Sequence, residues 1–365
     1  MKGFSASDAS SVYMNKKDNT QVFVGMSGGV DSSVSAYLLR KQGYEVTGVH
    51  LTCWNEGGCS DSEERDARRV AKTLGIPFYV FDLRKDYADK VVSYMVNGYR
   101  KGITPNPDVM CNKEIKFGAF LKRAIAMGAD YVATGHYARL KEKDGIYSIY
   151  AGKDRNKDQS YFLWTLNQDQ LRRAMFPIGE LTKPEVRKIA QKAGLHVSDK
   201  KDSQGICFVG RITLQRFLGN YLKQKSGQVI DTEGRVIGFH PGAHFYTIGQ
   251  RHGLGIALSR PHYIIHKDVK KNIIVLAGAN DAHLYQREVH LEKLNLNPDF
   301  KFSSNVLARI RYRQAMQSAR ISRSKNGCKL VFTKPVKFIA PGQSAVFYNT
   351  GGKLLGGGII LDKQV

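Results

Sequence analysis

A glycine- and serine-rich segment near the start of the chain carries the strongest chemical signal in the sequence. It consists of Gly25, Met26, Ser27, Gly28, Gly29, Val30, Asp31, Ser32 and Ser33. An apolar run precedes it and residues at helical spacing follow it, so it joins a strand to a helix N-terminus. Glycines there let backbone N–H groups approach an anion, and the unpaired N–H groups of the helix attract negative charge. The segment therefore predicts a phosphate-binding loop in which the serines add hydroxyl donors and Asp31 offers a carboxylate to Mg²⁺.

Two other chemistries use similar segments. The Walker A loop needs Gly-x4-Gly-Lys-Ser/Thr, and this segment contains no lysine. Residues 25–29 also satisfy Gly-x-Ser-x-Gly, the nucleophile elbow of α/β-hydrolases. The hydrolase interpretation leaves the following Asp-Ser-Ser and the net charge unexplained. A plain glycine turn needs fewer hydroxyl groups than this segment has.

Two further segments combine turn residues with a cysteine. Residues 104–118 contain Asp108 and Cys111, and residues 200–210 contain Cys207. Both cysteines stand among polar turn residues, which favours reactive thiols over buried small side chains. The remaining cysteines, which favour the buried interpretation, are Cys53, Cys59 and Cys328. No zinc-binding spacing is present, and an iron–sulfur cluster on Cys111, Cys207 and a third cysteine remains an alternative.

The first part of the chain alternates strands and helices. Strands are predicted at 21–25, 45–51, 78–82 and 130–134, and helices at 31–40 and 60–74. Such alternation predicts parallel strands with right-handed crossovers, which is a doubly wound, Rossmann-like α/β sheet. Ligands of such sheets bind at the carboxyl ends of the strands, where the glycine-rich segment stands.

The pattern changes near residue 210. A helix is predicted at 213–221, followed by short, glycine-rich β segments at 227–240, 243–258, 261–268 and 271–278 that suggest a small antiparallel domain. Further short β segments from about residue 279 predict a C-terminal β-barrel or sandwich. We therefore expect a loose leader at 1–20, an α/β domain at 21–209, a small β-rich central domain at 210–278 and a C-terminal barrel at 279–365.

Composition limits the class of protein and its partners. The chain has 365 residues with 56 Lys and Arg against 32 Asp and Glu, a net charge of +24 that favours a polyanionic partner. Residues 300–361 contain no acidic residue. No apolar stretch is long enough to cross a membrane, and the N-terminus lacks a secretory signal. Few and widely spaced cysteines favour a reducing compartment. We expect a cytoplasmic location, with a mitochondrial location as the alternative.

The glycine loop resembles the PP-loop of ATP pyrophosphatases, which release AMP and pyrophosphate. The wider set of motifs resembles the tRNA-specific 2-thiouridylase family (MnmA/TrmU) of that superfamily, from about residue 21 to the end. It includes the segments at 104–118, 133–137, 156–162, 200–210, 249–255, 311–314 and 341–348. The resemblance implies that 21–209 is the PP-loop catalytic domain and that the barrel binds tRNA.

The resemblance also implies a reaction. ATP adenylates O2 of a wobble uridine, which converts this oxygen into a leaving group as AMP. Sulfur arrives as a persulfide on Cys207, and Cys111 either forms a disulfide with Cys207 afterwards or first releases hydrosulfide from it. Asp108 is the implied general acid or base.

Further residues match positions that contact substrates in the family. The implied ATP contacts are Gly25, Met26, Ser27, Gly28, Gly29, Val30, Asp31, Ser32, Leu51 and Gly135, with Mg²⁺ bound together with ATP. The segment facing the target base is Asn106, Pro107 and Asp108. The implied tRNA contacts are His136, Lys157, Asp158, Gln159, Arg311, Tyr312 and Gln343. Implied partners are wobble-uridine tRNAs for Lys, Glu and Gln, and a sulfur-donor protein, either a cysteine desulfurase or a sulfur relay.

Two other functions remain as alternatives. A PP-loop ligase or amidotransferase acting on a small molecule would not need paired cysteines. An RNA-binding module with a degenerate nucleotide site would not need an intact glycine loop.

Overall fold

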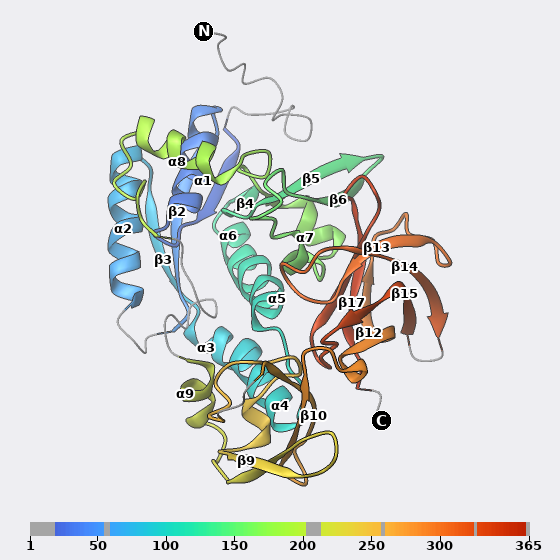
Figure 1. Cartoon of the computed structure of the whole chain (residues 1–365). Helices are drawn as coiled ribbons and strands as arrows, with labels where there is room; N and C mark the ends of the chain where they lie inside the picture. The colour runs from blue at the N-terminus through green and yellow to red at the C-terminus, as the bar shows by residue number, and fades with distance from the viewer. Residues whose placement is uncertain (1–18, 55–58, 202–212, 257–259, 325–326, 363–365) are drawn as a thin grey trace. The chain divides into compact units, whose positions relative to one another are not determined.

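The computed structural model describes residues 19–54, 59–201, 213–256, 260–324 and 327–362. These residues form two compact units (Figure 1). Unit 1 consists of the described residues within 1–91, 108–211 and 352–354, and unit 2 of those within 92–107, 212–351 and 355–365. The polypeptide therefore passes repeatedly from one unit to the other.

Unit 1 is built on a parallel sheet formed by five of the described strands. In spatial order they are β3 (Phe78–Asp82), β2 (Glu45–Thr52), β1 (Gln21–Gly25), β4 (Tyr131–Ala133) and β7 (Ala174–Met175). Every pairing between them is parallel. Val22 and Val24 of β1 are fully buried, as expected for a strand covered on both faces. The predicted Rossmann-like sheet is confirmed.

Helices connect these strands. The described α-helices of unit 1 include α1 (Val30–Lys41), α2 (Cys59–Leu74), α3 (Arg84–Tyr87), α6 (Leu121–Ala126), α7 (Gln168–Arg172) and α8 (Lys183–Lys192). The path β1–α1–β2–α2–β3 runs one way along the sheet and the path to β4 returns past β1. Right-handed crossovers therefore place α1 and α2 on one face and α6 on the other (Figure 1).

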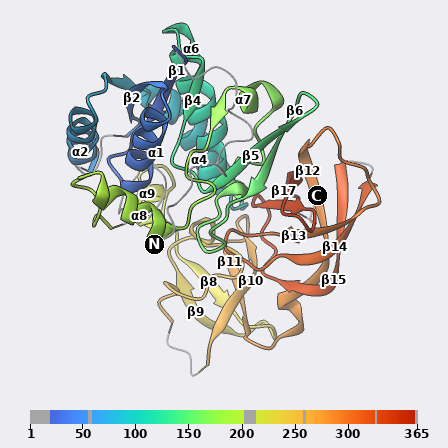
Figure 2. The same ribbon diagram turned by 90° about the horizontal axis from the view of Figure 1, so that it is seen from above.

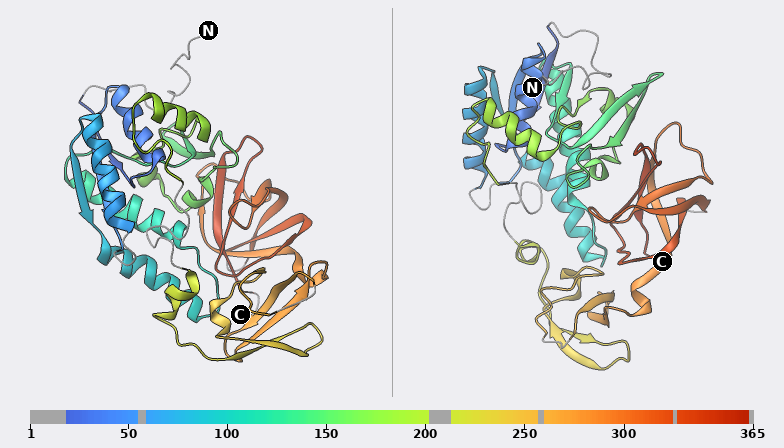
Figure 3. Two further views of the ribbon diagram at one scale, coloured as in Figure 1. Left: turned by 60° about the vertical axis from the view of Figure 1, so that its left-hand side comes forward. Right: turned by 45° about the horizontal axis from the view of Figure 1, so that its top comes forward.

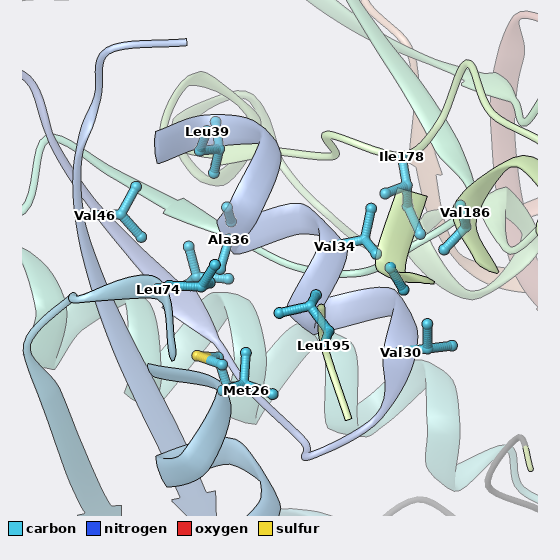
Figure 4. Packing of buried hydrophobic residues seen from close by; sticks show 14 of the residues in the cluster. Met26, Val30, Val34, Ala36, Leu39, Val46, Leu74, Ile178, Val186 and Leu195 are labelled. Carbon is cyan, nitrogen blue, oxygen red and sulfur yellow. The ribbon is translucent and has the colours of Figure 1, made fainter. Parts of the chain in front are cut away.

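One face of α1 packs into the core of unit 1. Figure 4 shows Val34 and Val30 of α1 close to Val186 of α8 and to Ile178 and Leu195, and all of these side chains are buried. Gly43 ends the helix with φ of +92°, a conformation that favours glycine. This packing fixes the N-terminus of α1, which follows the glycine loop.

Several elements of unit 1 lie outside the predicted pattern. They are a 3-10 helix at Ser160–Leu163, the hairpin of β5 (Ala138–Lys143) and β6 (Ile146–Ala151), and two π-helices, η2 (Ala88–Val92) and η3 (Asn112–Phe120). The hairpin appears in green at the upper right of the right-hand view in Figure 3. The π-helix η3 directly follows α5 (Pro107–Cys111). π-helical turns have no sequence template as simple as 3.6-residue periodicity, and they often mark functional sites.

Unit 2 contains a small β-sheet in the order β10-β11-β8-β9. Its elements are α4 (Ser93–Arg100), α9 (Leu214–Gly219), β8 (Gly227–Ile230), β9 (Val236–His240), β10 (His262–Asp268) and β11 (Ile273–Gly278). The expectation of a purely antiparallel sheet was wrong, because β11 pairs with β8 in parallel. The β segment expected at 243–258 was also wrong: its described part starts with a 3-10 helix at Ala243–Phe245 and continues as turns. Its glycines at 249, 253 and 255 have positive φ, which breaks a strand.

Six of the described strands in unit 2 close a barrel, coloured orange to red in Figure 2. Around the barrel they are β12 (Tyr285–Leu296), β15 (Gly327–Lys337), β14 (Gln317–Ser324), β13 (Asn305–Arg309), β16 (Ser344–Tyr348) and β17 (Leu354–Ile360). Leu291, Ile321 and Leu330 are fully buried inside it. The predicted barrel is confirmed.

Within the described ranges, no helix is both long enough and apolar enough to cross a membrane.

Candidate active site

The glycine-rich loop lies between β1 and α1, as the sequence predicted. Gly29 caps α1, and no side chain of the described residues makes a capping hydrogen bond there, so the first N–H groups of the helix suit a ligand. Gly28 has φ of +69°, and a Cβ there would lie 2.3 Å from the carbonyl oxygen of Glu63. The Ser32 hydroxyl accepts from Ser27 N at 3.2 Å and lies 3.4 Å from the Ser27 hydroxyl. Serine and backbone groups therefore converge on one turn that suits phosphate oxygens.

Asp31, in the first turn of α1, has two partners from distant parts of unit 1. Lys183 Nζ donates to Oδ1 at 2.8 Å and to Oδ2 at 2.9 Å. The Tyr137 hydroxyl donates to Oδ1 at 2.7 Å. Lys183 is only 8% exposed, so this ammonium group is largely removed from solvent. Sequence analysis did not single out Lys183, which is the first residue of α8 in the structure.

A second ion pair supports the back of the glycine loop. Lys200 Nζ donates to the carbonyl oxygen of Gly28 at 3.0 Å and to Asp66 Oδ2 at 2.6 Å. His196 Nε2 lies 3.2 Å from Asp66 Oδ1. Burial raises the pKa of the neighbouring Glu63 carboxyl. Lys200 thus connects the loop to α2, and sequence reasoning did not single it out.

The loop that follows β4 packs closely against the first turn of α1. A Cβ on Gly135 would lie 2.7 Å from Ser32 N, so this approach requires glycine. Both loops follow the adjacent strands β1 and β4, where the strand order reverses and where ligands of such sheets bind. Met26 and Leu51, two of the implied ATP contacts, are 1% and 6% exposed.

His136 is buried directly after Gly135. Its Nδ1 lies 2.7 Å from the Thr134 hydroxyl, and its ring packs against Phe117 and Phe176. Burial, reinforced by the positive charge of Lys116, holds the pKa of His136 well below its usual value of 6.5. This side chain is therefore neutral at physiological pH.

Asp108 and Cys111 share the short helix α5. Cys111 is fully buried at its end, immediately before the π-helix η3. Asn112 donates from Nδ2 to the carbonyl oxygen of Asp108 at 3.0 Å, and its buried Oδ1 has no partner among the described residues. The wider turn of η3 is supported by Gln170, whose Nε2 donates to the carbonyl oxygen of Phe117 at 2.7 Å. Neither polar residue was predicted.

The second predicted thiol, Cys207, lies outside the described residues. Of the remaining cysteines, Cys53 and Cys328 are buried, as expected, while the side chain of Cys59 is not described. Burial raises the pKa of the Cys328 thiol to about 11, which makes it unreactive at neutral pH.

The segment at 157–159 is tied to unit 1 by hydrogen bonds. Oδ1 of the buried Asp158 accepts from Gly152 N at 3.0 Å and from Ser160 N at 3.1 Å. Gln159 Oε1 accepts from Tyr137 N at 3.0 Å. Lys157 is half-buried. Asp158 and Gln159 thus fix the loop that carries Lys157.

The predicted tRNA contacts of the barrel lie in unit 2. The Arg311 guanidinium donates to the carbonyl oxygen of Ile248, and the guanidinium of the exposed Arg313 lies 5.4 Å from the half-buried ring of Tyr312. Gln343 donates from Nε2 to the carbonyl oxygens of Thr104 at 2.9 Å and Pro105 at 3.3 Å. Arg311 and Gln343 therefore make internal contacts in this structure.

A parallel sheet with an uncapped glycine loop at the reversal of its strand order defines a nucleotide-binding α/β domain. Here that domain also carries a buried cysteine beside a π-helix and is followed by a small β-rich domain and a closed barrel. The chain belongs to the tRNA-specific 2-thiouridylase family.

Family models match three successive regions. Residues 20–211 match the tRNA methyl transferase HUP domain, 215–278 the tRNA methyl transferase PRC-barrel domain, and 286–360 the aminomethyltransferase beta-barrel domain. Together these matches cover most of the chain.

Curated relatives match over almost their whole length. The tRNA-specific 2-thiouridylase MnmA 2 of Geobacillus kaustophilus is 47% identical over 358 residues, covering 95% of this chain and 96% of the relative. The enzyme named MnmA in Alkaliphilus oremlandii is 47% identical and covers 94% and 97%. That of Listeria monocytogenes is 46% identical and covers 93% and 94%.

Proposed function

We propose that this protein is a tRNA-specific 2-thiouridylase that uses ATP to replace O2 of a wobble uridine with sulfur, releasing AMP and pyrophosphate. The observation that carries the proposal is the match to curated 2-thiouridylases along 95% of the chain at 47% identity. The glycine loop at the carboxyl end of β1 provides the nucleotide site that such a reaction requires.

The ATP site is assigned to the glycine loop and its surroundings. Its residues are Gly25, Met26, Ser27, Gly28, Gly29, Val30, Asp31, Ser32, Leu51 and Gly135. The uncapped N-terminus of α1 and the serine hydroxyls suit the phosphates, and the buried Leu51 suits the apolar face of adenine. Mg²⁺ bound with ATP would offset phosphate charge. Asp31 is a fitting ligand only after it releases Lys183, because that ammonium occupies both of its oxygens.

Sulfur transfer is assigned to Cys111 and Cys207. A persulfide sulfur must gain two electrons to become the thiocarbonyl sulfur, and two thiols supply them by forming a disulfide. In one route, the outer sulfur of the persulfide on Cys207 attacks the activated C2, and the Cys111 thiolate then attacks Cys207 Sγ. In the other route, Cys111 first attacks Cys207 Sγ and releases hydrosulfide, which attacks C2. Asp108, on the same short helix as Cys111, is the proposed acid or base for the uracil ring.

Residues of several loops are proposed to contact tRNA. They are Asn106, Pro107, His136, Lys157, Asp158, Gln159, Arg311, Tyr312 and Gln343. Tyr312 offers a ring for stacking on an unpaired base, and the acid-free stretch 300–361 supplies positive charge for the phosphate backbone. His136 and Asp158 are buried and act by shaping the loops at 135–137 and 152–160.

Partners and compartment complete the proposal. The substrates are wobble-uridine tRNAs for Lys, Glu and Gln, and the sulfur donor is a cysteine desulfurase or a sulfur relay protein. Functional domains are assigned at 21–209, 210–278 and 279–365. A reducing compartment keeps the two cysteines in the thiol state, which favours the cytoplasm over the alternative, the mitochondrion.

A reconstituted reaction tests the function. The protein is incubated with ATP, Mg²⁺, unmodified tRNA, a cysteine desulfurase and cysteine, and the digested tRNA is analysed for 2-thiouridine by mass spectrometry. We expect 2-thiouridine to form, with one AMP released per sulfur transferred. Absence of 2-thiouridine with an active donor would refute the proposal.

Variants separate the roles of the thiols. Cys111→Ser and Cys207→Ser should each abolish thiolation, and pyrophosphate release should persist if adenylation precedes sulfur transfer. Cys328→Ala is the matched control, because this thiol is buried in the barrel core. If the protein were instead a small-molecule ligase, both serine variants would keep the ligase activity, because that reaction does not need paired cysteines.

A further inference from the structure

A loop of the barrel holds the chain just before the segment that carries Asp108 and Cys111. Thr104 N donates to the carbonyl oxygen of Pro341 at 2.7 Å. Gln343 Nε2 donates to the carbonyl oxygens of Thr104 at 2.9 Å and of Pro105 at 3.3 Å. Residues 92–107 and the barrel loop belong to the same compact unit. Hydrogen bonds therefore fix consecutive peptide groups of the segment at 104–105.

Close packing reinforces these hydrogen bonds. Gly342 has φ of +88°, and a Cβ there would lie 3.0 Å from backbone atoms of Thr104. Pro105 packs against α4, because a Cβ on Gly98 would lie 2.7 Å from the proline ring. Thr104 and Asn106 are 5% and 9% exposed. The segment at 104–106 is thus enclosed as well as hydrogen-bonded.

The supporting loop is itself anchored in the barrel. Gly342 N donates to the carbonyl oxygen of Ile360 at 2.9 Å, and Ile360 N donates to that of Gln343 at 2.8 Å. Ile360 is the last residue of β17 and is 2% exposed. The loop that carries Gln343 is therefore held in place by β17.

The held segment leads directly into α5. Asn106 is followed by Pro107, the first residue of the helix, and then by Asp108 and Cys111. Proline fixes its own φ, so the direction of so short a helix depends on the peptides before it. Small displacements of reacting groups greatly slow a reaction that needs aligned partners.

We propose that Gln343 is a positioning residue for sulfur transfer: its amide fixes residues 104–106 and thereby the start of the helix that carries Asp108 and Cys111. The kinetic part of this inference rests on the proposed function. Because its amide nitrogen donates to two protein carbonyl oxygens, Gln343 offers RNA mainly its acceptor Oε1. A positioning role predicts that loss of the Gln343 amide lowers kcat, whereas a direct RNA contact predicts that it mainly raises the tRNA dissociation constant.

Gln343→Met tests the inference, because methionine has a similar length and no N–H donor. We expect kcat for thiolation at saturating tRNA to fall at least about tenfold. The tRNA dissociation constant, measured by filter binding, should rise by a smaller factor than kcat falls, since the variant loses one polar contact with RNA and no ionic contact. Without tRNA, alkylation of Cys111 by iodoacetamide should accelerate at least about threefold, because its segment opens more readily. Mass spectrometry of the Cys111 peptide measures that rate.

A second variant disturbs the contact between the barrel loop and Thr104 while it keeps the Gln343 side chain. Gly342→Ala introduces a methyl group against Thr104 and should reproduce the loss of kcat and the faster alkylation. Matched controls are Gln228→Met, at an exposed strand position, and Gly234→Ala, whose φ of +83° is close to that of Gly342 and whose added Cβ meets no described atom within 4 Å. Both controls should behave like the wild type.

Two results would overturn the inference. Weaker tRNA binding with unchanged kcat and alkylation would make Gln343 an RNA contact only, and no change in all three would leave it without a role. If the wild-type protein forms no 2-thiouridine, the proposed function fails instead. The alkylation rate and hydrogen exchange at residues 104–111 then still decide whether Gln343 holds the segment.

Discussion

Lys183 Nζ donates hydrogen bonds to both carboxylate oxygens of Asp31. Asp31 lies in the first turn of α1, next to the N–H groups that suit ATP phosphates. A carboxylate there would repel phosphate unless a cation offset its charge. Lys183 supplies that cation from α8, and the largely buried position of its side chain limits screening by solvent. The glycine loop contains no lysine, so Lys183 gives the site a positive charge from another element.

In the absence of Mg²⁺, Lys183→Met should weaken ATP binding about tenfold or more, since no cation then compensates the charge of Asp31 beside the phosphates. AMP, with fewer charges, should lose less affinity. Isothermal titration calorimetry measures both. Lys192→Met, at the exposed end of α8, is the matched control and should bind like the wild type.

The double variant Lys183→Met, Asp31→Asn tests the reason for this effect. If Lys183 acts by neutralising Asp31, the second change should restore at least half of the lost binding free energy. No recovery would contradict that explanation and would indicate direct contact between Lys183 and phosphate.

Gly135→Ala should disturb the same loop by steric contact alone. The added Cβ would lie 2.7 Å from Ser32 N and 2.8 Å from the carbonyl carbon of Asp31, both backbone atoms that cannot swing away. Gly135 does not need a positive φ, so backbone strain adds nothing. We expect the KM for ATP to rise about tenfold and the free energy of unfolding to fall by about 1–3 kcal/mol.

Urea denaturation and initial rates of pyrophosphate release measure these two effects. Gly219→Ala is the control, because the added Cβ would meet no atom of the described residues within 4 Å and the residue lies in helix α9. That change should leave stability unchanged or raise it slightly. Normal ATP kinetics in Gly135→Ala would show that the loop tolerates the displacement.

Gln170→Ala should loosen the π-helix that follows Cys111. Gln170 Nε2 donates to the carbonyl oxygens of Phe117 at 2.7 Å and Lys113 at 3.3 Å. In the wider turn of the π-helix, these carbonyl groups can accept a hydrogen bond from a side chain. Loss of these bonds should lower the free energy of unfolding by about 1–3 kcal/mol. It should also accelerate alkylation of Cys111.

Urea denaturation and peptide mass spectrometry check both effects. Gln191→Ala is the control, because that side chain is exposed and, within the described part of the chain, makes only a 3.5 Å hydrogen bond to Asp199. A normal alkylation rate in Gln170→Ala would separate the π-helix from the reactivity of Cys111.

Local signals predicted the elements around the glycine loop. The apolar run at 21–25, Gly29 before α1 and Gly43 after it set the boundaries of β1 and α1 with little tertiary help. β12 was not predicted, because YQREVHLEKLNL mixes charged and apolar residues, and the pairing of β12 with β15 and β17 decides its conformation.

Contacts between distant residues account for the unpredicted part of the site. Lys183 and Asp31 are separated by 152 positions, and Gln343 and Thr104 by 239. No local pattern marks such pairs, because each side chain alone suits an exposed helix or loop. The family resemblance named Gln343 but not the carbonyl groups that it holds. The π-helix η3 likewise depends on Gln170, more than fifty positions away.

The buried His136 predicts a pH dependence of stability. Burial holds its folded-state pKa well below 6.5, whereas the unfolded chain binds a proton near pH 6.5. As pH falls below about 6.5, the unfolded state therefore binds more protons than the folded state and stability is lost, by up to about 1.4 kcal/mol per pH unit. His136→Gln does not titrate, and its amide can still bond to the Thr134 hydroxyl. Urea denaturation between pH 7.5 and 5.5 should therefore show a shallower loss in the variant, and equal slopes would mean that His136 accepts a proton inside the folded protein.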